Sequence, residues 1–198
     1  MTAWRLIARD VAWRSALLPV AFFLIVITLG VFGAGSVSAN GGDVARGLIW
    51  SALFLAFTLP VPLLFAPARA SGVLDQLKVA GFATELIAAC RMLSLFLSLA
   101  PPLLLASVLA NTMLGLVPAH GLVDLLIGMA GLSALAVLAA ALTGGTAAAE
   151  ALAAVVVLPI AIPMLIFGAG GATGLLAASA LVLVAVSPFA AGTALKDL

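Results

Sequence analysis

Charged residues divide this chain of 198 residues into a few long apolar stretches. Five intervals carry no charge at all: 28 residues after Arg14, 22 after Arg46, 32 after Arg91, 25 after Asp124 and 45 after Glu150. An apolar α-helix needs about 20 residues to cross the hydrocarbon core of a bilayer. The first four intervals therefore accommodate one crossing each and the last accommodates two, which predicts six transmembrane helices.

Polar turns between the apolar runs set the expected limits of these helices. We expect a polar, glycine-containing turn at residues 38–43 and a tight hairpin at residues 168–171. Between the third and fourth spans, Pro118 and His120 interrupt the apolar pattern. We expect the spans at 17–35, 47–65, 92–114, 122–143, 151–167 and 173–193. The pattern thus predicts one all-α integral membrane domain over residues 1–198.

Composition supports lipid as the surrounding medium. Hydrophobic residues make up 66% of the chain and charged residues 8%, against roughly 45–50% and 25% in soluble domains. The first apolar run is too long for a signal-peptide core, and five similar runs follow it. The single cysteine, Cys90, excludes an internal disulfide and a cysteine-based metal site.

The basic residues indicate which way the helices face. Six crossings place both termini on one side of the membrane, and only Arg46 falls on the other side. The remaining basic residues share the side of the termini: Arg5, Arg9, Arg14, Arg69, Lys78, Arg91 and Lys196. Because basic residues favour the cytoplasmic side, we expect cytoplasmic N- and C-termini.

An amphipathic segment precedes the first span. Trp4, Ile7 and Val11 share one helical face, and Arg5 and Arg9 lie opposite. This pattern predicts an N-terminal helix over residues 1–14 that lies in the membrane interface. The alternative is a cytoplasmic extension of the first helix, in which the arginines act only as topology signals.

The segment 66–91 is the expected cytoplasmic loop with the most charged residues, since it holds five of the fifteen charges. Ser71 is placed to cap a short helix, in which Leu74 and Leu77 share a face, and another helix is expected to begin at Thr84. One interpretation is a docking element that passes movement from a cytoplasmic motor into the spans. The other is an ordinary amphipathic connector, and the pattern alone leaves both open.

Asp124, which we expect at the outer interface, is the only charged residue within the expected spans, and this argues against an ion-coupled carrier. Proline is their more visible feature, because each proline removes a backbone donor and can bend its helix. Pro159 and Pro163 fall on one helical face. The candidate hinges are Pro60, Pro62, Pro101, Pro102, Pro159, Pro163 and Pro188. The alternative is that proline is simply common in membrane helices.

Motifs for enzymatic chemistry are missing from the chain. It contains no glycine-rich phosphate loop, no His-Glu-x-x-His metal motif and no Gly-x-Ser-x-Gly nucleophile motif. His120, the only histidine, fits an interfacial surface residue better than a haem or metal ligand. We therefore expect a non-enzymatic protein with no cofactor of its own and no nucleic-acid partner, which draws any energy from another subunit.

Four stretches resemble a known family. Residues 22–29, 46–50, 157–167 and 187–196 are similar to segments of the CcmB family, the ABC-type permease subunits of bacterial cytochrome c maturation. The resemblance implies an ABC-2-like permease in the bacterial inner membrane that serves haem delivery. It also implies these partners: an ATPase subunit that binds ATP, a haem-handling membrane protein, a small membrane subunit and a haem chaperone. Two permease copies are expected if the ATPase is a dimer.

Residues 71–77 resemble the docking segment of that family, which implies a set of ATPase-docking residues: Arg69, Ser71, Gly72, Leu74, Asp75, Gln76 and Leu77. The resemblance implies that Leu74 and Leu77 fill a groove on the ATPase. The polar residues Arg69, Asp75 and Gln76 then fix the orientation of the ATPase on the permease. The chain departs from the family at 66–68, where acidic residues are replaced by Ala-Pro-Ala, and near 144–145, where a basic group is missing.

Two other functions remain as alternatives. The chain is then an export permease for a lipid, a drug or a polysaccharide, or a membrane scaffold that transports nothing. Both share the predicted helices, so the helical pattern does not separate them from haem delivery.

Overall fold

The computed structural model describes residues 13–33, 41–117, 121–143 and 147–196, with the side chains of 13–15, 41 and 147–156 left outside this description. Within the described part all regular elements are helices. The six long helices are α2 (Trp13–Gly33), α3 (Gly41–Thr58), α6 (Thr84–Met113), α7 (Leu122–Thr143), α8 (Ala147–Ala169) and α9 (Thr173–Lys196). Three short helices follow α3: the 3₁₀ helix η1 (Val61–Leu63), α4 (Ala66–Ala70) and α5 (Val73–Val79).

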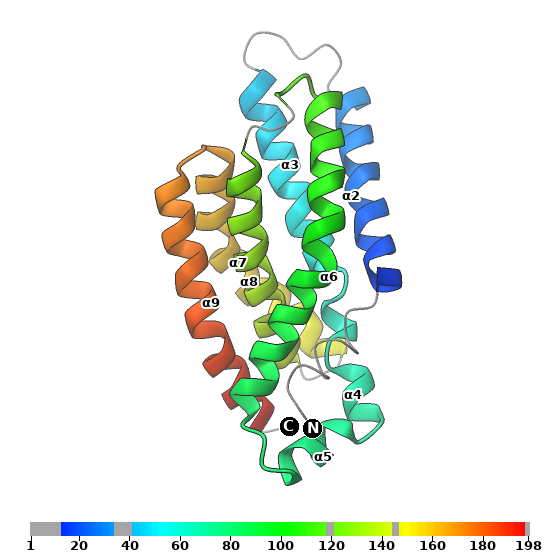
Figure 1. Ribbon diagram of the computed structural model, residues 1–198, viewed down its shortest axis with the longest axis vertical. Coiled ribbons are helices and arrows are strands. Elements are labelled where there is room, and N and C mark those ends of the chain that lie inside the picture. Colours follow the sequence, from blue (N-terminus) through cyan, green and yellow to red (C-terminus); the bar gives the residue numbers. More distant parts are fainter. Residues whose placement is uncertain (1–12, 34–40, 118–120, 144–146, 197–198) are drawn as a thin grey trace.

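The long helices form an antiparallel bundle in which successive long helices run in opposite directions (Figure 1). The helices α4 and α5 lie at one end of the molecule, beside the start of α6 and the end of α9 (Figure 1). We call this the α5 end. The opposite, far end carries the start of α3, the end of α6, the start of α7 and the turn between α8 and α9.

Six apolar helices are present, as the uncharged intervals predict. Five segments are long and apolar enough to cross a bilayer: 16–33, 42–70, 84–113, 122–143 and 173–196. The sixth helix, α8, is 23 residues long, and the part with described side chains, Val157–Ala169, is apolar. The limits of α7 coincide with the predicted limits 122–143. The predicted all-α membrane fold is therefore confirmed.

The helix α3 is displaced from its predicted limits of 47–65. It begins six residues earlier, at Gly41, with Asp43 in its first turn, where an acid interacts favourably with the helix dipole. It ends at Thr58, before Pro60 and Pro62, which lack the N–H groups needed to continue the helical ladder. These two prolines therefore end the helix and do not bend it.

The helix α6 joins two segments that the sequence pattern separates. It runs without a break for 30 residues, so the start at Thr84 and the predicted span 92–114 belong to one helix. At 1.5 Å per residue it is about 45 Å long, which exceeds the hydrocarbon thickness of a bilayer, about 30 Å. Pro101 and Pro102 lie inside it, and Figure 1 shows that its ribbon changes direction along its length. Proline is a usual cause of such bends.

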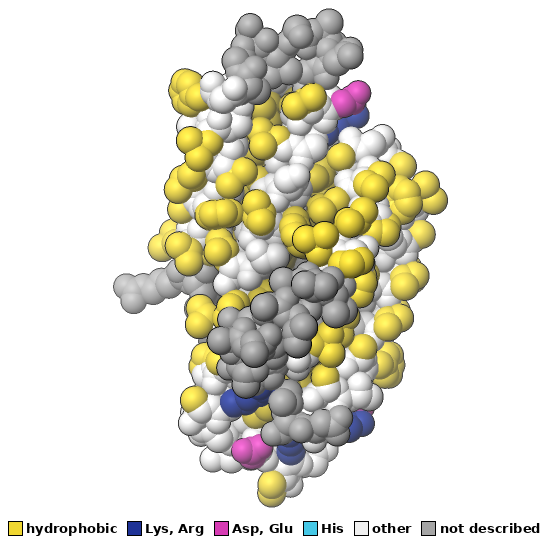
Figure 2. All heavy atoms as spheres, turned by 180° about the vertical axis from the view of Figure 1, so that it is seen from behind, with side chains coloured by type: hydrophobic (Ala, Val, Ile, Leu, Met, Phe, Trp, Pro, Cys, Tyr) yellow, Lys and Arg dark blue, Asp and Glu magenta, His cyan; other side chains and the backbone are white. Residues whose placement is uncertain are grey.

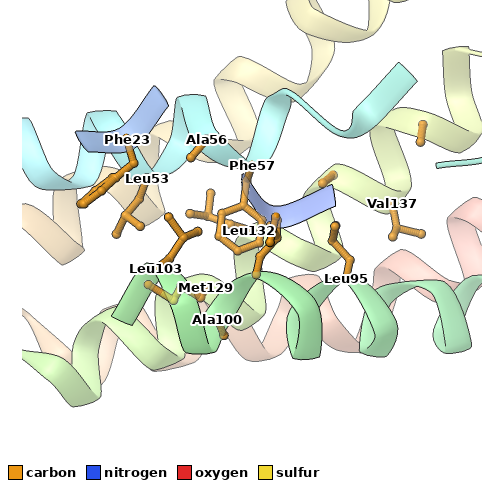
Figure 3. Close-up of a cluster of buried hydrophobic side chains, with 14 of the residues drawn as sticks. Phe23, Leu53, Ala56, Phe57, Leu95, Ala100, Leu103, Met129, Leu132 and Val137 are labelled. Atoms are coloured by element: carbon orange, nitrogen blue, oxygen red, sulfur yellow. The ribbon is translucent and has the colours of Figure 1, made fainter. Parts of the chain in front are cut away.

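The core is built where α2, α3, α6 and α7 meet. Figure 3 shows Phe23 of α2 and Leu53 and Phe57 of α3 directed toward Leu103 of α6 and Leu132 of α7. All five side chains are at most 1% exposed. Among the five membrane-length segments the one formed by α7 is the most enclosed, because 72% of its most apolar stretch is buried, against 22% for those of α2 and α9.

Small residues bring α7 close to its neighbours. A methyl group at Gly131 would lie 2.6 Å from the sulfur of Met164 on α8 and 3.1 Å from the Cβ of Ala180 on α9. Glycine at such a crossing lets the backbones approach, which is how membrane helices gain packing energy without a hydrophobic driving force. The outer surface carries hydrophobic side chains along its middle and charged side chains toward its two ends (Figure 2), as expected for a protein surrounded by lipid.

The remaining predicted hinges lie inside long helices. Pro159 and Pro163 are both in α8 and both are exposed, so they face away from the bundle. Pro188 is in α9. Whether these residues act as hinges stays a prediction. The predicted interfacial helix falls on residues 1–12, which lie outside the described residues, and on the first two residues of α2.

Candidate docking site at the α5 end

The short helices of the α5 end arise from the chain that follows α3. The amide of Leu63 donates to the carbonyl of Pro60 at 3.0 Å and closes the 3₁₀ turn. Pro67 occupies the first turn of α4, where its missing N–H group leaves no bond unmade. Phe65, which is 2% exposed, anchors this connection in the core. The segment is thus held against the bundle before it reaches α5.

The turn from α4 into α5 differs from the prediction. Ser71 was expected to cap α5, but its hydroxyl donates backwards to the carbonyl of Pro67 at 2.8 Å. The N-cap of α5 is Gly72, and no side chain caps the helix. Gly72 has a φ of 68°, a left-handed conformation that glycine adopts without steric cost. The capping prediction is wrong, because the hydroxyl finds an acceptor one turn earlier.

The helix α5 turns its leucines inward. Leu74 is 3% exposed and belongs to the hydrophobic core, and Leu77 is half-buried and packs against it. The expectation that these leucines fill a groove on an ATPase is therefore corrected for Leu74: it attaches α5 to its own chain. The face turned to solvent carries Asp75 and Gln76, which are both exposed.

Sequence reasoning missed Val79 at the end of α5. It is 90% exposed, the largest exposed fraction among the large hydrophobic residues that the structure describes. On a helix of 3.6 residues per turn, positions 75, 76 and 79 fall within about 100° of one another. The i, i+4 spacing of Asp75 and Val79 was the available signal. The exposed surface of α5 is thus two polar side chains with one isolated apolar side chain, which we call the α5 face.

A tight elbow connects α5 to α6. The amide of Phe82 donates to the carbonyl of Leu77 at 3.1 Å, and that of Gly81 to the carbonyl of Lys78 at 3.0 Å. These two bonds and the φ of 82° at Gly81 form the Schellman ending of a helix. Only residues 80–83, the elbow, lie between the end of α5 and the start of α6. A movement of α5 therefore has a short path into the longest helix.

The first turn of α6 is also held by the end of α9. The Nζ atom of Lys196 donates to Oε1 of Glu85 at 2.6 Å. Close beside this pair, a methyl group at Gly192 would lie 2.8 Å from Cγ and 2.9 Å from the backbone nitrogen of Glu85. The ion pair is partly exposed, with 28% of the Glu85 side chain and 56% of the Lys196 side chain accessible, so its own contribution is modest. The contact fixes α9 to the elbow, and we call it the Glu85 clamp.

A small cleft lies beside the clamp. It has a volume of about 370 Å³ and is lined by Lys78, Phe82, Ala83, Thr84, Glu85 and Lys196. Within the described residues no group of three or more His, Cys, Asp or Glu side chains is arranged to hold a metal ion. The α5 end thus carries the exposed α5 face and, beside the Glu85 clamp, this cleft.

Six apolar helices in an antiparallel bundle, with short helices at one end, define a multi-span all-α membrane protein, and this arrangement is consistent with a permease. The profile of the CcmB protein family matches residues 1–197, and the chain belongs to this family. The resemblance seen in the four sequence stretches is confirmed.

Relatives in several bacteria share most of the length. The chain is 36% identical to the heme exporter protein B of Rhodobacter capsulatus over 194 residues, which cover 90% of this chain and 89% of the relative. It is 32% identical to the heme exporter protein B of Bradyrhizobium diazoefficiens, with 92% and 89% covered. It is 35% identical to the protein of the same name in Pseudomonas aeruginosa, with 77% and 70% covered.

Proposed function

We propose that this protein is the membrane-spanning subunit of an ABC transporter that exports haem for the maturation of c-type cytochromes, with the α5 face as its docking surface for a separate ATPase subunit. Membership of the CcmB family and the names of the relatives support the haem cargo. The observation that carries the docking site is the exposed face of α5, which is anchored from below by Leu74 and connected directly to α6.

The mechanism follows from how α5 is attached. The ATPase contacts Asp75, Gln76 and Val79, while Leu74 and Leu77 keep α5 on the permease. When ATP binding closes the ATPase subunits, α5 is displaced and the elbow at 80–83 carries the displacement into α6. The Glu85 clamp then moves the end of α9 with it. Arg69, Ser71 and Gly72 position the helix from its N-terminal side.

The charges support a cytoplasmic location for the α5 end. Arg69, Lys78 and Lys196 lie at or near this end, whereas Arg46 belongs to the start of α3 at the far end. Basic residues are retained on the cytoplasmic side of a membrane. The protein then resides in the inner membrane with both termini in the cytoplasm, where an ATPase has access to ATP. Haem is cargo in this proposal and not a resident cofactor.

The remaining partners follow from the family. They are a haem-handling membrane protein, a small membrane subunit and a haem chaperone, which is released with its haem when ATP is hydrolysed. A dimeric ATPase presents two docking grooves, so two permease chains, or this chain and a second membrane subunit, complete the assembly. The α5 face supplies one such contact per chain.

Co-purification tests the docking surface. In Val79→Asp a charge replaces the one apolar side chain of the α5 face. Because the loss of a hot-spot contact costs about 2 kcal/mol or more and about 1.4 kcal/mol is tenfold, we expect recovery of the ATPase with the permease in mild detergent to fall at least about tenfold. The matched control is Val44→Asp, because Val44 is 61% exposed at the far end. Substituting Leu74 is unsuitable, since it is buried and its loss would disturb folding.

Crosslinking gives a second readout. A cysteine at Gln76 in a Cys90→Ala background should crosslink to the ATPase, and a cysteine at Val44 should not. Equal recovery of the ATPase with Val79→Asp, Val44→Asp and the unchanged chain, together with no crosslink from position 76, would refute docking at the α5 face.

A further inference from the structure

A recess opens at the far end, away from the proposed docking surface. The helices α3 and α6 reach beyond the turn between α8 and α9, which ends lower in the bundle (Figure 1). This difference in height leaves a cavity of about 580 Å³ between α3, the end of α6, the start of α7 and the α8–α9 turn. Ligand sites typically measure about 300–1,000 Å³, so the volume suits a small amphiphile or the head of a lipid.

Both signs of charge line the recess. Arg46 of α3 and Asp124 of α7 are half-buried lining residues, and the buried Asn111 of α6 adds a polar group. Within the described residues Arg46 pairs with Asp43, at 3.6 Å between Nη1 and Oδ1, and not with Asp124. Because 86% of the Asp43 side chain is exposed, this pair is weak and leaves the guanidinium able to bind a ligand.

The floor of the recess is apolar and rigid. It includes Trp50, which is 4% exposed. Its indole packs against glycines of α7 and α8, which have no side chain to collide with it. A methyl group at Gly128 would come within 2.2 Å of the ring, and one at Gly168 within 2.4 Å. The backbones of α7 and α8 therefore hold the indole in place. Gly171, with a φ of 67°, brings the α8–α9 turn near the Arg46 guanidinium without a side chain to fill the space.

The charges select the kind of ligand. A dianion would meet the Asp124 carboxylate as well as the single guanidinium of Arg46, and a simple cation would meet that guanidinium. A zwitterion satisfies both signs, with its anionic group on Arg46 and its cationic group on Asp124. The apolar floor and the exposed Val117 at the rim, which is 65% exposed, favour a zwitterion that carries hydrocarbon.

We propose that the recess binds the headgroup of a zwitterionic phospholipid of the phosphatidylethanolamine type. The phosphate accepts hydrogen bonds from the Arg46 guanidinium, and the primary ammonium donates hydrogen bonds to the Asp124 carboxylate. A trimethylammonium group has no N–H to donate, so phosphatidylcholine makes only the first contact. Phosphatidylglycerol offers no cation to Asp124. The acyl chains leave along the apolar rim toward the bilayer.

This proposal is independent of ATPase docking and of the haem cargo, and the full chain alone tests it. Native mass spectrometry of the purified, delipidated protein measures how tightly each lipid binds. We expect one site that prefers phosphatidylethanolamine to phosphatidylcholine and to phosphatidylglycerol by about tenfold, the worth of one charge-assisted hydrogen-bonding contact. Weak binding of the other lipids over the outer surface forms the background.

Two substitutions separate the two halves of the headgroup. Asp124→Asn should abolish the preference for phosphatidylethanolamine over phosphatidylcholine while phosphate-dependent binding remains. Arg46→Gln should lower the binding affinity for phosphatidylethanolamine and for phosphatidylcholine about tenfold each. Asp43→Asn is the matched control, because Asp43 contacts Arg46 but does not line the cavity, and it should keep the preference. The preference is a ratio within one sample, so partial misfolding of a variant does not obscure it.

Two outcomes would overturn the proposal. One is an equal affinity for the three lipids in the unchanged chain, or an unaltered preference in Asp124→Asn. The other is tight, Arg46-dependent binding of protoporphyrin IX without any preference for phosphatidylethanolamine, which would assign the recess to a dicarboxylic macrocycle.

Discussion

The contact between α9 and the first turn of α6 allows a sharp test of how closely these helices must pack. In Gly192→Ala the added methyl group would lie 2.8 Å from Cγ, 2.9 Å from N and 3.0 Å from Cα of Glu85. Two of these atoms belong to the backbone, so the neighbour cannot rotate away. Overpacking of this kind costs about 1–3 kcal/mol, and the better helix propensity of alanine returns about 1 kcal/mol at most.

Gly174 is the matched control for this substitution. It lies on the same helix, and a methyl group there would meet no atom within 4 Å. Gly174→Ala should therefore show only the propensity gain. The two variants then differ by the overpacking term, which for a chain of this size corresponds to a difference in Tm of roughly 2–12 °C. The direction is fixed: Gly192→Ala unfolds at the lower temperature.

The assay uses the single cysteine. Cys90 is half-buried in α6, in the helical turn after the one that holds Glu85, so a thiol-reactive fluorescent dye reports unfolding as the temperature rises. Each variant is compared in the same detergent. If Gly192→Ala unfolds at the same temperature as Gly174→Ala or above it, the close approach of α9 to Glu85 is refuted, and with it the route by which the clamp moves α9.

Two further predictions concern the elements that surround α5. Glu85→Lys and Lys196→Glu should each lower cytochrome c production in cells. The double exchange should restore production, because the 2.6 Å ion pair is then rebuilt with its charges reversed. If production stays low in the double exchange, the pair has no coupling role. Gly72→Ala should destabilise the α4–α5 turn by about 1–2 kcal/mol, since its φ of 68° is unfavourable for a residue with a Cβ. Gly47→Ala, with no atom within 4 Å of the added methyl group, is its control, and faster protease cleavage between α4 and α5 in Gly72→Ala alone is the measurement.

The number and order of the long helices follow from the sequence alone. A charge or an unpaired backbone group in hydrocarbon is costly, so uncharged intervals of sufficient length mark the crossings without any knowledge of tertiary contacts. The limits of α7 were predicted to the residue. The displacement of α3 has local causes, since Asp43 favours its early start and Pro60 and Pro62 lack the N–H groups that would continue the helix beyond Thr58.

The docking residues show where local pattern is insufficient. An amphipathic helix must cover its apolar face, but its sequence does not say whether the cover is its own chain or a partner. For α5 the tertiary structure decides: the core of this chain covers Leu74, and Val79 stays exposed. The family resemblance assigned Leu74 to a surface that meets a partner, whereas the structure buries it in the core of its own chain.

Contacts between residues far apart in the chain were decided only by the tertiary structure. Glu85 and Lys196 are 111 positions apart, and Arg46, Asn111 and Asp124 come from three different helices before they line one recess. Hydrophobicity along the chain determines which segments leave water, because that cost is paid segment by segment. Which side chains then meet depends on how the helices cross and where they end, and these are properties of the packed bundle as a whole.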